Sequence, residues 1–191
     1  MSYFDNNATT PLHPDARQAL LDASTENWAN PSSPYRISAK VRASMQKCRE
    51  SIASYLGTDP DQITFTSGST EANNSVFSNL ARTADPSSRV LLSPYEHPSV
   101  TEAAHLWFSD RVDILTAQSD GTVSTDDFEE YLSKGSLPAL VSILAASNES
   151  GAIQPWREAA RICQKYGVPY HCDSTQLPGK ENLNDISLCT Y

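Results

Sequence analysis

The feature that most restricts the fold of this chain is the alternation of short β-rich runs with helical runs after Gly57. The pattern predicts strands over residues 62–66, 89–93, 111–116, 140–145, 168–172 and 186–190, and helices over 69–81, 99–108, 124–132 and 155–166. The run at 140–145 contains few polar residues, which is typical of a strand covered on both faces of its sheet. Strands and helices that alternate in this way predict an α/β fold with a mostly parallel sheet and helices on both faces.

Two helices are expected before this pattern begins. The weaker one covers residues 14–26, and the longer one carries an apolar stripe at spacings of three and four. The stripe consists of Ile37, Val41, Met45, Cys48, Ile52 and Tyr55. We expect Ser32 or Ser33 to cap the start of the longer helix, Pro34 to occupy its first turn and Gly57 to end it in the left-handed conformation.

The composition excludes several classes of protein. The chain has 191 residues, of which 39% are hydrophobic, and its formal net charge is −9. These values suit a folded domain of ordinary size and argue against nucleic acid as a partner, because phosphate binding requires a basic surface. No run approaches the roughly 20 apolar residues of a membrane span, and the first residues lack the basic region of a secretory signal. We therefore expect a cytoplasmic protein with no membrane partner.

The four cysteines do not indicate a disulfide framework or a metal site. Cys48, Cys163, Cys172 and Cys189 are far apart in the sequence, and no two of them form a C-x-x-C pair. Each belongs to an apolar segment, where cysteine usually behaves as a small buried hydrophobic residue. We expect neither metal binding nor redox chemistry from these thiols.

A first candidate site follows the predicted strand at 62–66. Gly68 is followed by Ser69 and Thr70 at the start of a predicted helix, so that backbone N–H groups and two hydroxyls favour an anion. The same residues are also compatible with Ser69 as an ordinary N-cap. The sequence has no Walker loop and no G-x-G-x-x-G motif.

Further polar residues follow the next predicted strands. His97 comes after 89–93, Asn148 after 140–145 and Asp173 after 168–172, with Gln176 three residues further on. Each also has a simpler interpretation: His97 as a loop residue or helix cap, Asn148 as a turn residue, and Asp173 as a carboxylate paired with a cation.

Ligands of parallel sheets bind beyond the carboxyl ends of the strands, where these residues converge. They would supply an anion site, an aromatic ring, an amide and a carboxylate. Pyridoxal 5'-phosphate requires this set, because its phosphate must be held, its ring stacked, its phenolic oxygen hydrogen-bonded and its pyridinium nitrogen paired with a carboxylate. The sequence therefore predicts pyridoxal 5'-phosphate as the cofactor.

Six ordered motifs carry a family resemblance. They are Phe4-Asp-Asn-Asn-Ala-Thr-Thr-Pro11, Asn30-Pro-Ser-Ser33, Phe65-Thr-Ser-Gly-Ser-Thr-Glu71, Glu96-His-Pro98, Asn148-Glu-Ser-Gly151 and His171-Cys-Asp-Ser-Thr-Gln176. In this order the motifs resemble the N-terminal half of the cysteine desulfurases, which are class V aminotransferase-fold pyridoxal phosphate enzymes of the NifS/IscS type. The resemblance implies part of a fold-type I large domain, incomplete in this chain.

The resemblance also implies roles for the candidate residues. Ser69 and Thr70 would bind the cofactor phosphate, and His97 would stack on the pyridine ring and transfer protons. The remaining three would be cofactor-binding residues, namely Asn148 at the cofactor oxygen or the substrate carboxylate, Asp173 at the pyridinium nitrogen and Gln176 at the phenolic oxygen.

By the same resemblance, the enzyme converts L-cysteine to L-alanine, passes sulfur on as an enzyme persulfide to an acceptor protein, serves iron–sulfur cluster assembly and is a homodimer. Residues 1–14 would lie near the active site and the dimer interface, residues 15–57 would form N-terminal helices, and 58–191 would form part of the cofactor-binding domain. The Schiff-base lysine, the substrate arginine and the persulfide cysteine would lie beyond Tyr191. Two alternatives stay open: another class V enzyme such as a selenocysteine lyase, or a non-catalytic chain that complements a second polypeptide.

Overall fold

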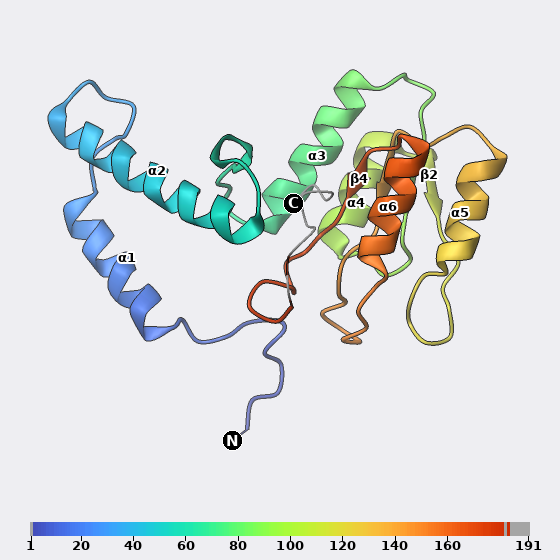
Figure 1. The fold of residues 1–191 in the computed structure, drawn as a ribbon, viewed down its shortest axis with the longest axis horizontal. Helices are drawn as coiled ribbons and strands as arrows, with labels where there is room; N and C mark the ends of the chain where they lie inside the picture. The colour runs from blue at the N-terminus through green and yellow to red at the C-terminus, as the bar shows by residue number, and fades with distance from the viewer. Residues whose placement is uncertain (1, 182, 184–191) are drawn as a thin grey trace. The chain divides into compact units, whose positions relative to one another are not determined.

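The computed structural model describes residues 2–181 and 183. The chain forms two compact units, Met1–Thr64 and Phe65–Tyr191. The first contains the helices α1 (Pro14–Glu26) and α2 (Arg36–Leu56) and the short 3-10 helix η1 (Pro60–Gln62). Figure 1 labels α1 and α2, which are drawn in blue to cyan. Both predicted N-terminal helices are therefore confirmed.

The end of α2 follows the prediction and its start does not. Gly57 ends the helix with φ 67°, a left-handed conformation that glycine adopts without steric cost. The helix begins at Arg36 after Tyr35, without a side-chain cap, so the predicted caps Ser32 and Ser33 are wrong and Pro34 precedes the first turn. The reason is a separate turn, in which the Asn30 side chain accepts a hydrogen bond from the Ser32 amide at 2.9 Å and the Asn30 carbonyl accepts one from the Ser33 amide.

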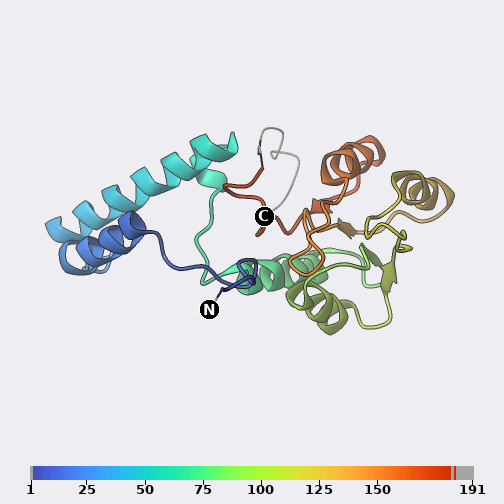
Figure 2. The ribbon, with the colours of Figure 1, turned by 90° about the horizontal axis from the view of Figure 1, so that it is seen from below.

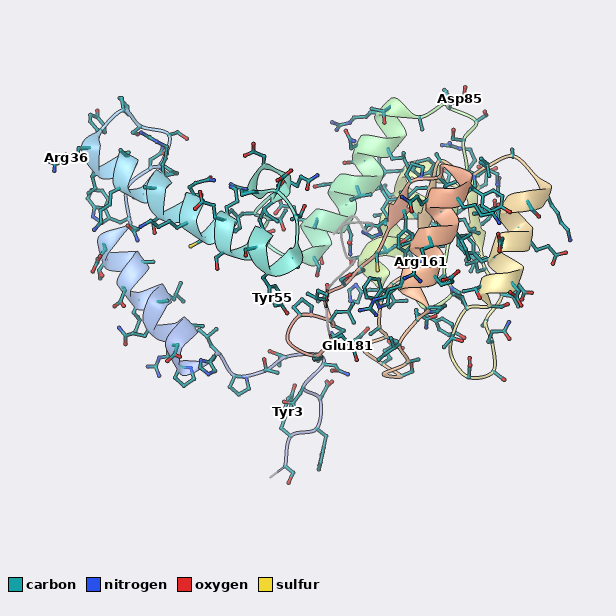
Figure 3. The ribbon with its side chains drawn as sticks, in the orientation of Figure 1. Tyr3, Arg36, Tyr55, Asp85, Arg161 and Glu181 are labelled. Atoms are coloured by element: carbon teal, nitrogen blue, oxygen red, sulfur yellow. The ribbon has the colours of Figure 1, made fainter. Side chains whose placement is uncertain are left out.

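The apolar stripe of α2 is mostly exposed. Of its six residues only Val41 is buried, and Cys48 is exposed, so the prediction of a buried Cys48 is wrong. The buried positions of α2 are Ser38, Val41 and Ala53, because α1 buries none of its own residues and offers little surface to cover the stripe. Figure 3 marks Tyr55, the last residue of the stripe, near the end of α2. Within the described residues, no helix is long and apolar enough to cross a membrane.

The second unit is built on a four-stranded parallel sheet. Its strands are β1 (Val90–Leu92), β2 (Val112–Ile114), β3 (Leu140–Ser142) and β4 (Tyr170–His171). Their order is β2-β1-β3-β4, with Val90 in register with both Val112 and Leu140. Four predicted strands are thus confirmed, each shorter than predicted, and the predicted strand at 186–190 falls outside the described residues.

The strand predicted at 62–66 is wrong. Gln62 is the last residue of η1, whose start is fixed by Pro60 and by a capping box between Asp59 and Gln62. Residues 63–66 are not paired with a strand within the part of the chain that the structure describes. The β-branched side chains of Ile63 and Thr64 gave the strand-like pattern, but a strand also requires a neighbour to receive its backbone hydrogen bonds.

Helices cover both faces of this sheet, as predicted. They are α3 (Ser69–Thr83), α4 (Pro98–Phe108), α5 (Thr125–Lys134) and α6 (Trp156–Tyr166). Figure 2 shows α3 and α4 on one side of the strands and α5 and α6 on the other. On the first side, Phe77, Val100 and Phe108 pack with Val90 and Leu92 of β1. Successive side chains of a strand point to opposite faces, so Val90 and Leu92 point to the same face, which α3 and α4 cover.

The strand order creates a switch point between β1 and β3. From β1 the chain passes through α4 to β2 on one side, then returns across the sheet to β3 and continues to β4 on the other side. Ligands of open parallel sheets bind at the carboxyl ends of the strands where the order reverses. The segments that follow β1 and β3 therefore define the place to look for a site.

Truncation of a buried side chain in the core should lower the stability of the fold. Phe108 of α4 is 1% exposed, and we expect Phe108→Ala to lower the free energy of unfolding by about 3–5 kcal/mol, because it removes apolar burial and leaves a cavity. Leu106 on the same helix is 71% exposed, and Leu106→Ala should change it by less than about 0.5 kcal/mol. Urea unfolding followed by circular dichroism measures both values, and equal losses would contradict this description of the core.

Candidate active site

The first turn of α3 presents Ser69 and Thr70 to solvent. Gly68 is the N-cap, with φ 157° and no side-chain cap, so Ser69 is the first helical residue and not an N-cap. The first amides of a helix have no intrahelical acceptor, and the positive end of the helix dipole lies beside them. Glu71 uses two nearby donors, because its carboxylate accepts hydrogen bonds from the Ser67 hydroxyl and amide at 2.6 Å, and these bonds lower its pKa. The remaining amides and hydroxyls of this turn suit an anion.

His97 is the N-cap of α4 and follows β1 directly at the switch point. Its Nδ1 accepts a hydrogen bond from the Ser99 amide at 3.1 Å and lies 2.8 Å from the Ser99 hydroxyl. Since Nδ1 accepts, the neutral ring carries its proton on Nε2. The side chain is therefore a helix cap and also an exposed imidazole whose Nε2–H is directed away from its cap.

Asp173 follows β4 and is half-buried. Its Oδ2 accepts a hydrogen bond from Asn73 Nδ2 at 2.9 Å, and its Oδ1 accepts two from Thr175, from the hydroxyl at 2.6 Å and the amide at 3.0 Å. Burial raises the pKa of Asp173, but the hydrogen bonds from Thr175 and Asn73 and the proximity of His171 together outweigh burial and lower it. Asp173 is thus an anion held by neutral donors, and no described lysine or arginine forms an ion pair with it.

Asn148 and Gln176 lie in the turns that follow β3 and β4, and both are half-buried. The turn that contains Asn148 is stabilised by Ser147, whose hydroxyl accepts hydrogen bonds from the amides of Glu149 and Ser150 at 3.2 Å. Gln176 accepts a hydrogen bond from Lys180 at 2.7 Å.

Asn73 of α3 connects the predicted residues. One Nδ2 donates to Asp173 and also to the Ser99 hydroxyl at 3.0 Å, and Ser99 in turn contacts His97. His97 and Asp173, which are far apart in the sequence, are therefore joined through two buried side chains. Ser69 and Thr70 lie four and three residues before Asn73, on the same face of α3.

Sequence reasoning missed the buried polar residues beneath this site. They are Asn73, Glu96, Ser99, Ser142 and His171, all of which are buried. A signal was available, because Ser142 and His171 interrupt apolar strands and a buried polar side chain must have a partner. The identity of each partner was not readable from the sequence, since the partners are up to 100 residues apart.

Two of these buried groups are ionisable, and burial shifts the pKa of each toward the neutral form. Burial lowers the pKa of His171 to about 4, although the negative charge of Asp173 acts in the opposite direction. Burial raises the pKa of Glu96 to about 7; the hydrogen bonds from Ser93 and Leu144 and the contact with Ser142 oppose this shift, and the charge of Asp173 adds to it. His171 also contacts the edge of the Phe77 ring, at a centroid distance of 5.9 Å.

The site residues fit a phosphorylated, cationic aromatic ligand. The first turn of α3 can bind a phosphate, and Asp173 is an anion able to pair with a ring nitrogen. Asp173 keeps this charge without a lysine or arginine partner in the described residues, so a cationic ligand would meet an unneutralised carboxylate. The fold and site define an α/β protein of the class that binds ligands at the switch point of a parallel sheet.

Comparison with known proteins is consistent with this class. The family model "Aminotransferase class-V" matches residues 2–187, and the chain therefore belongs to that family. It is 36% identical over 186 residues to a NifS/IcsS protein homolog of Lactobacillus delbrueckii subsp. bulgaricus, covering 94% of this chain and 47% of that protein. It is 32% identical over 185 residues to the cysteine desulfurase IscS of Dictyoglomus turgidum, covering 95% of this chain and 46% of that protein.

A solved structure gives the same result for the fold. The structure titled "SspA in complex with cysteine" matches with a TM-score of 0.89 at 26% identity, over 98% of this chain and 55% of that one. A second structure, titled "NIFS-LIKE PROTEIN", matches with a TM-score of 0.89 at 32% identity, over 97% of this chain and 52% of that one, so the predicted α/β fold is confirmed. The chain spans about half the length of the curated relatives it matches.

Loss of Asn73 should disturb both of its ionisable partners. Asn73→Ala leaves His171 Nε2 without its acceptor and removes a donor from Asp173, so we expect the free energy of unfolding to fall by about 1–3 kcal/mol. The folded-state pKa of Asp173 should rise, so the variant should gain less stability than wild type as the pH increases through the ordinary pKa of aspartate.

Urea unfolding between acid and neutral pH measures both effects. Asn74→Ala is the matched control, because Asn74 donates to the Thr70 carbonyl in its own helix. If the Asn73 and Asn74 variants had the same stability at every pH, Asn73 would not join these two groups.

Proposed function

We propose that the natural-length protein is a pyridoxal phosphate-dependent cysteine desulfurase, which removes sulfur from L-cysteine and leaves L-alanine. The observation that carries this proposal is Asp173, a half-buried carboxylate that follows β4, stays ionised and is fixed by Asn73 from the helix that bears Ser69 and Thr70. The names of the relatives support the same activity, and a structural neighbour is titled as a complex with cysteine.

Pyridoxal phosphate, when bound, supplies an electron sink for negative charge at the Cα atom of an amino acid. The residues of this chain hold and orient it. Ser69, Thr70 and the amides of the first turn of α3 would bind the phosphate. Asp173 would keep the pyridinium nitrogen protonated, because an adjacent anion favours the charged form of that nitrogen. Gln176 would donate to the phenolic oxygen, and Asn148 would contact the cofactor oxygen or the substrate carboxylate.

His97 would stack on the ring and transfer protons at the substrate. The hydrogen bonds that Ser99 makes to Nδ1 leave the proton of the neutral ring on Nε2, so Nε2–H is a hydrogen-bond donor in that form. Imidazole is the side-chain group that most often transfers protons in catalysis. The cap geometry of α4 keeps the imidazole in this orientation.

The partners and location are part of the proposal. We infer a cytoplasmic homodimer that passes its sulfur to an acceptor protein for iron–sulfur cluster assembly. Residues 1–14 would approach the active site and the dimer interface, ahead of the N-terminal helices at 15–57 and the cofactor-binding domain that begins at 58. Large exposed hydrophobic residues on the first unit, which include Trp28 and Met45, support association through that unit.

Removal of the Asp173 charge tests the cofactor assignment. Asp173→Asn should weaken pyridoxal phosphate binding roughly 10–100-fold, because a hydrogen bond to a charged group is worth about 1.5–3 kcal/mol, and should nearly abolish turnover. Cofactor affinity is measured by fluorescence titration of the natural-length apo-protein. Asp110→Asn, at an exposed loop position, is the control. Wild-type affinity and turnover in Asp173→Asn would refute the assignment.

Substitution of His97 separates proton transfer from helix capping. Asparagine is a good N-cap, so His97→Asn should keep the stability of α4 and lose about 10²–10⁴-fold in the rate of alanine formation from L-cysteine. Cofactor affinity should fall only by the stacking contribution, about 0.5–1.5 kcal/mol. His105→Ala, at an exposed position on the same helix, is the control. Normal turnover in His97→Asn would leave this residue as a cap alone.

A further inference from the structure

Glu96 is a buried carboxyl group for which the proposed chemistry has no use. It lies between β1 and His97, and it contacts the ends of two strands. Its Oε1 accepts hydrogen bonds from the Ser93 hydroxyl and from the Leu144 amide, both at 2.7 Å. Its Oε2 lies 3.2 Å from the Ser142 hydroxyl oxygen, and no lysine or arginine in the described residues forms an ion pair with it.

The Ser142 hydroxyl begins a chain of contacts that reaches Asp173. Its oxygen is 2.8 Å from His171 Nδ1, and His171 Nε2 is 3.1 Å from Asn73 Oδ1. Asn73 Nδ2 then donates to Asp173 at 2.9 Å. The number of protons that each of these groups can donate, and the number of atoms with which it can accept, are known. The position of each proton can therefore be assigned by counting.

The assignment starts at Asp173, which is ionised and only accepts. The Asn73 atom that faces it must therefore be Nδ2, and Oδ1 must face His171. Because Oδ1 only accepts, His171 carries a proton on Nε2. Burial lowers the pKa of His171 to about 4, so the ring is neutral near pH 7 and Nδ1 has no proton.

The remaining protons are then fixed. His171 Nδ1 accepts, so the single proton of the Ser142 hydroxyl is donated to it. The contact between Ser142 and Glu96 Oε2 is left without a proton unless Glu96 itself supplies one. An ionised Glu96 would place two acceptors against each other in a buried position, which costs free energy. A neutral Glu96 with its proton on Oε2 satisfies every group.

We propose that Glu96 is a positioning residue that works as a neutral carboxylic acid. Its O–H donates to Ser142, which fixes the tautomer of His171 and the orientation of the Asn73 amide, and so holds the Asp173 carboxylate in place. The role toward the cofactor rests on the function proposed above, whereas the protonation state of Glu96 does not.

The pH range over which Glu96 affects stability depends on the titratable groups that face it. His171 contacts Glu96 through the Ser142 hydroxyl, and Asp173 acts on it through its negative charge. His97 is the next residue in the chain. The pKa of His171 is about 4 and that of Asp173 is lowered, so both titrate below the range in which Glu96 does. The pKa of Glu96 is about 7 in the folded state and 4.5 by its ordinary value. The folded protein therefore holds a proton that the unfolded chain releases, and stability is lost as the pH rises from about 4.5 through about 7.

The test compares Glu96→Gln with Glu96→Ala in the natural-length protein. The glutamine amide can donate to Ser142 and its oxygen can accept from Ser93 and Leu144, so it reproduces the neutral acid. We expect Glu96→Gln to bind pyridoxal phosphate within about threefold of wild type and Glu96→Ala to bind it at least tenfold more weakly. Glu102→Gln, at an exposed position on α4, controls for the loss of one negative charge.

Two measurements need no cofactor. The ratio of the unfolding constants of wild type and Glu96→Gln should increase by about two orders of magnitude between pH 4.5 and pH 7.5, since the pKa difference is about 2.5 units, while Glu102→Gln should follow wild type. The infrared spectrum of wild type should contain a protonated carboxyl band that disappears near pH 7 and is absent from Glu96→Gln.

Some results would overturn the proposal. These are equal loss of cofactor affinity in Glu96→Gln and Glu96→Ala, a ratio of unfolding constants independent of pH, or a wild-type infrared spectrum without the protonated band at pH 6. If wild type itself bound no pyridoxal phosphate, the proposed function would fail, and the unfolding and infrared measurements would still decide the state of Glu96.

Discussion

The hydrogen bond from Asn73 to Asp173 is the interaction on which the arrangement of the site depends. It joins α3 to the end of β4 across one hundred residues of sequence, and the same amide contacts Ser99 and His171. A side-chain amide suits this place, because it supplies donors to an anion on one side and an acceptor to a neutral imidazole on the other. An apolar residue would leave His171 Nε2 without its acceptor and would remove one donor from Asp173 and one from the Ser99 hydroxyl, and a charged residue would bring a further desolvation cost.

Two carboxyl groups lie near the switch point, and their surroundings divide them into different roles. Asp173 is half-buried and accepts three hydrogen bonds, so its pKa is lowered and it is an anion. Glu96 is buried and lies near the negative charge of Asp173, and both raise its pKa. Both shifts have the same origin, which is the balance between desolvation and the hydrogen bonds available to the charged form. One carboxyl group is thus suited to hold a cation, and the other to donate a proton within the protein.

The two units of the chain differ in how well they bury their apolar residues. The second has helices on both faces of its sheet and buries large side chains such as Phe77 and Trp156. The first leaves most of the α2 stripe exposed, because it has no layer of its own to cover that side. An amphipathic helix with an exposed apolar face is typical of a surface that another part of a protein or a partner covers.

The sequence by itself determined the elements whose signals are local. The apolar stripe of α2, the left-handed end at Gly57 and the runs of β1 and β3 depend on a few neighbouring residues, and all were predicted. The sequence also predicted that His97 and Asp173 lie at the same end of the sheet, because residues that follow parallel strands lie at the carboxyl ends of those strands. The resemblance to the cysteine desulfurases depended on motif order, which is also a property of the sequence.

The tertiary structure alone decided what depends on distant partners. Residues 62–66 have the composition of a strand, yet they remain unpaired in the described chain, because pairing needs a neighbour that composition does not supply. Cys48 has the spacing of a core residue but is exposed, because within the described residues no element covers its side of α2. The opposite protonation states of Glu96 and Asp173 also depend on the fold. Burial and hydrogen-bond partners set a carboxyl pKa, and here the partners come from segments that only the folded sheet brings together.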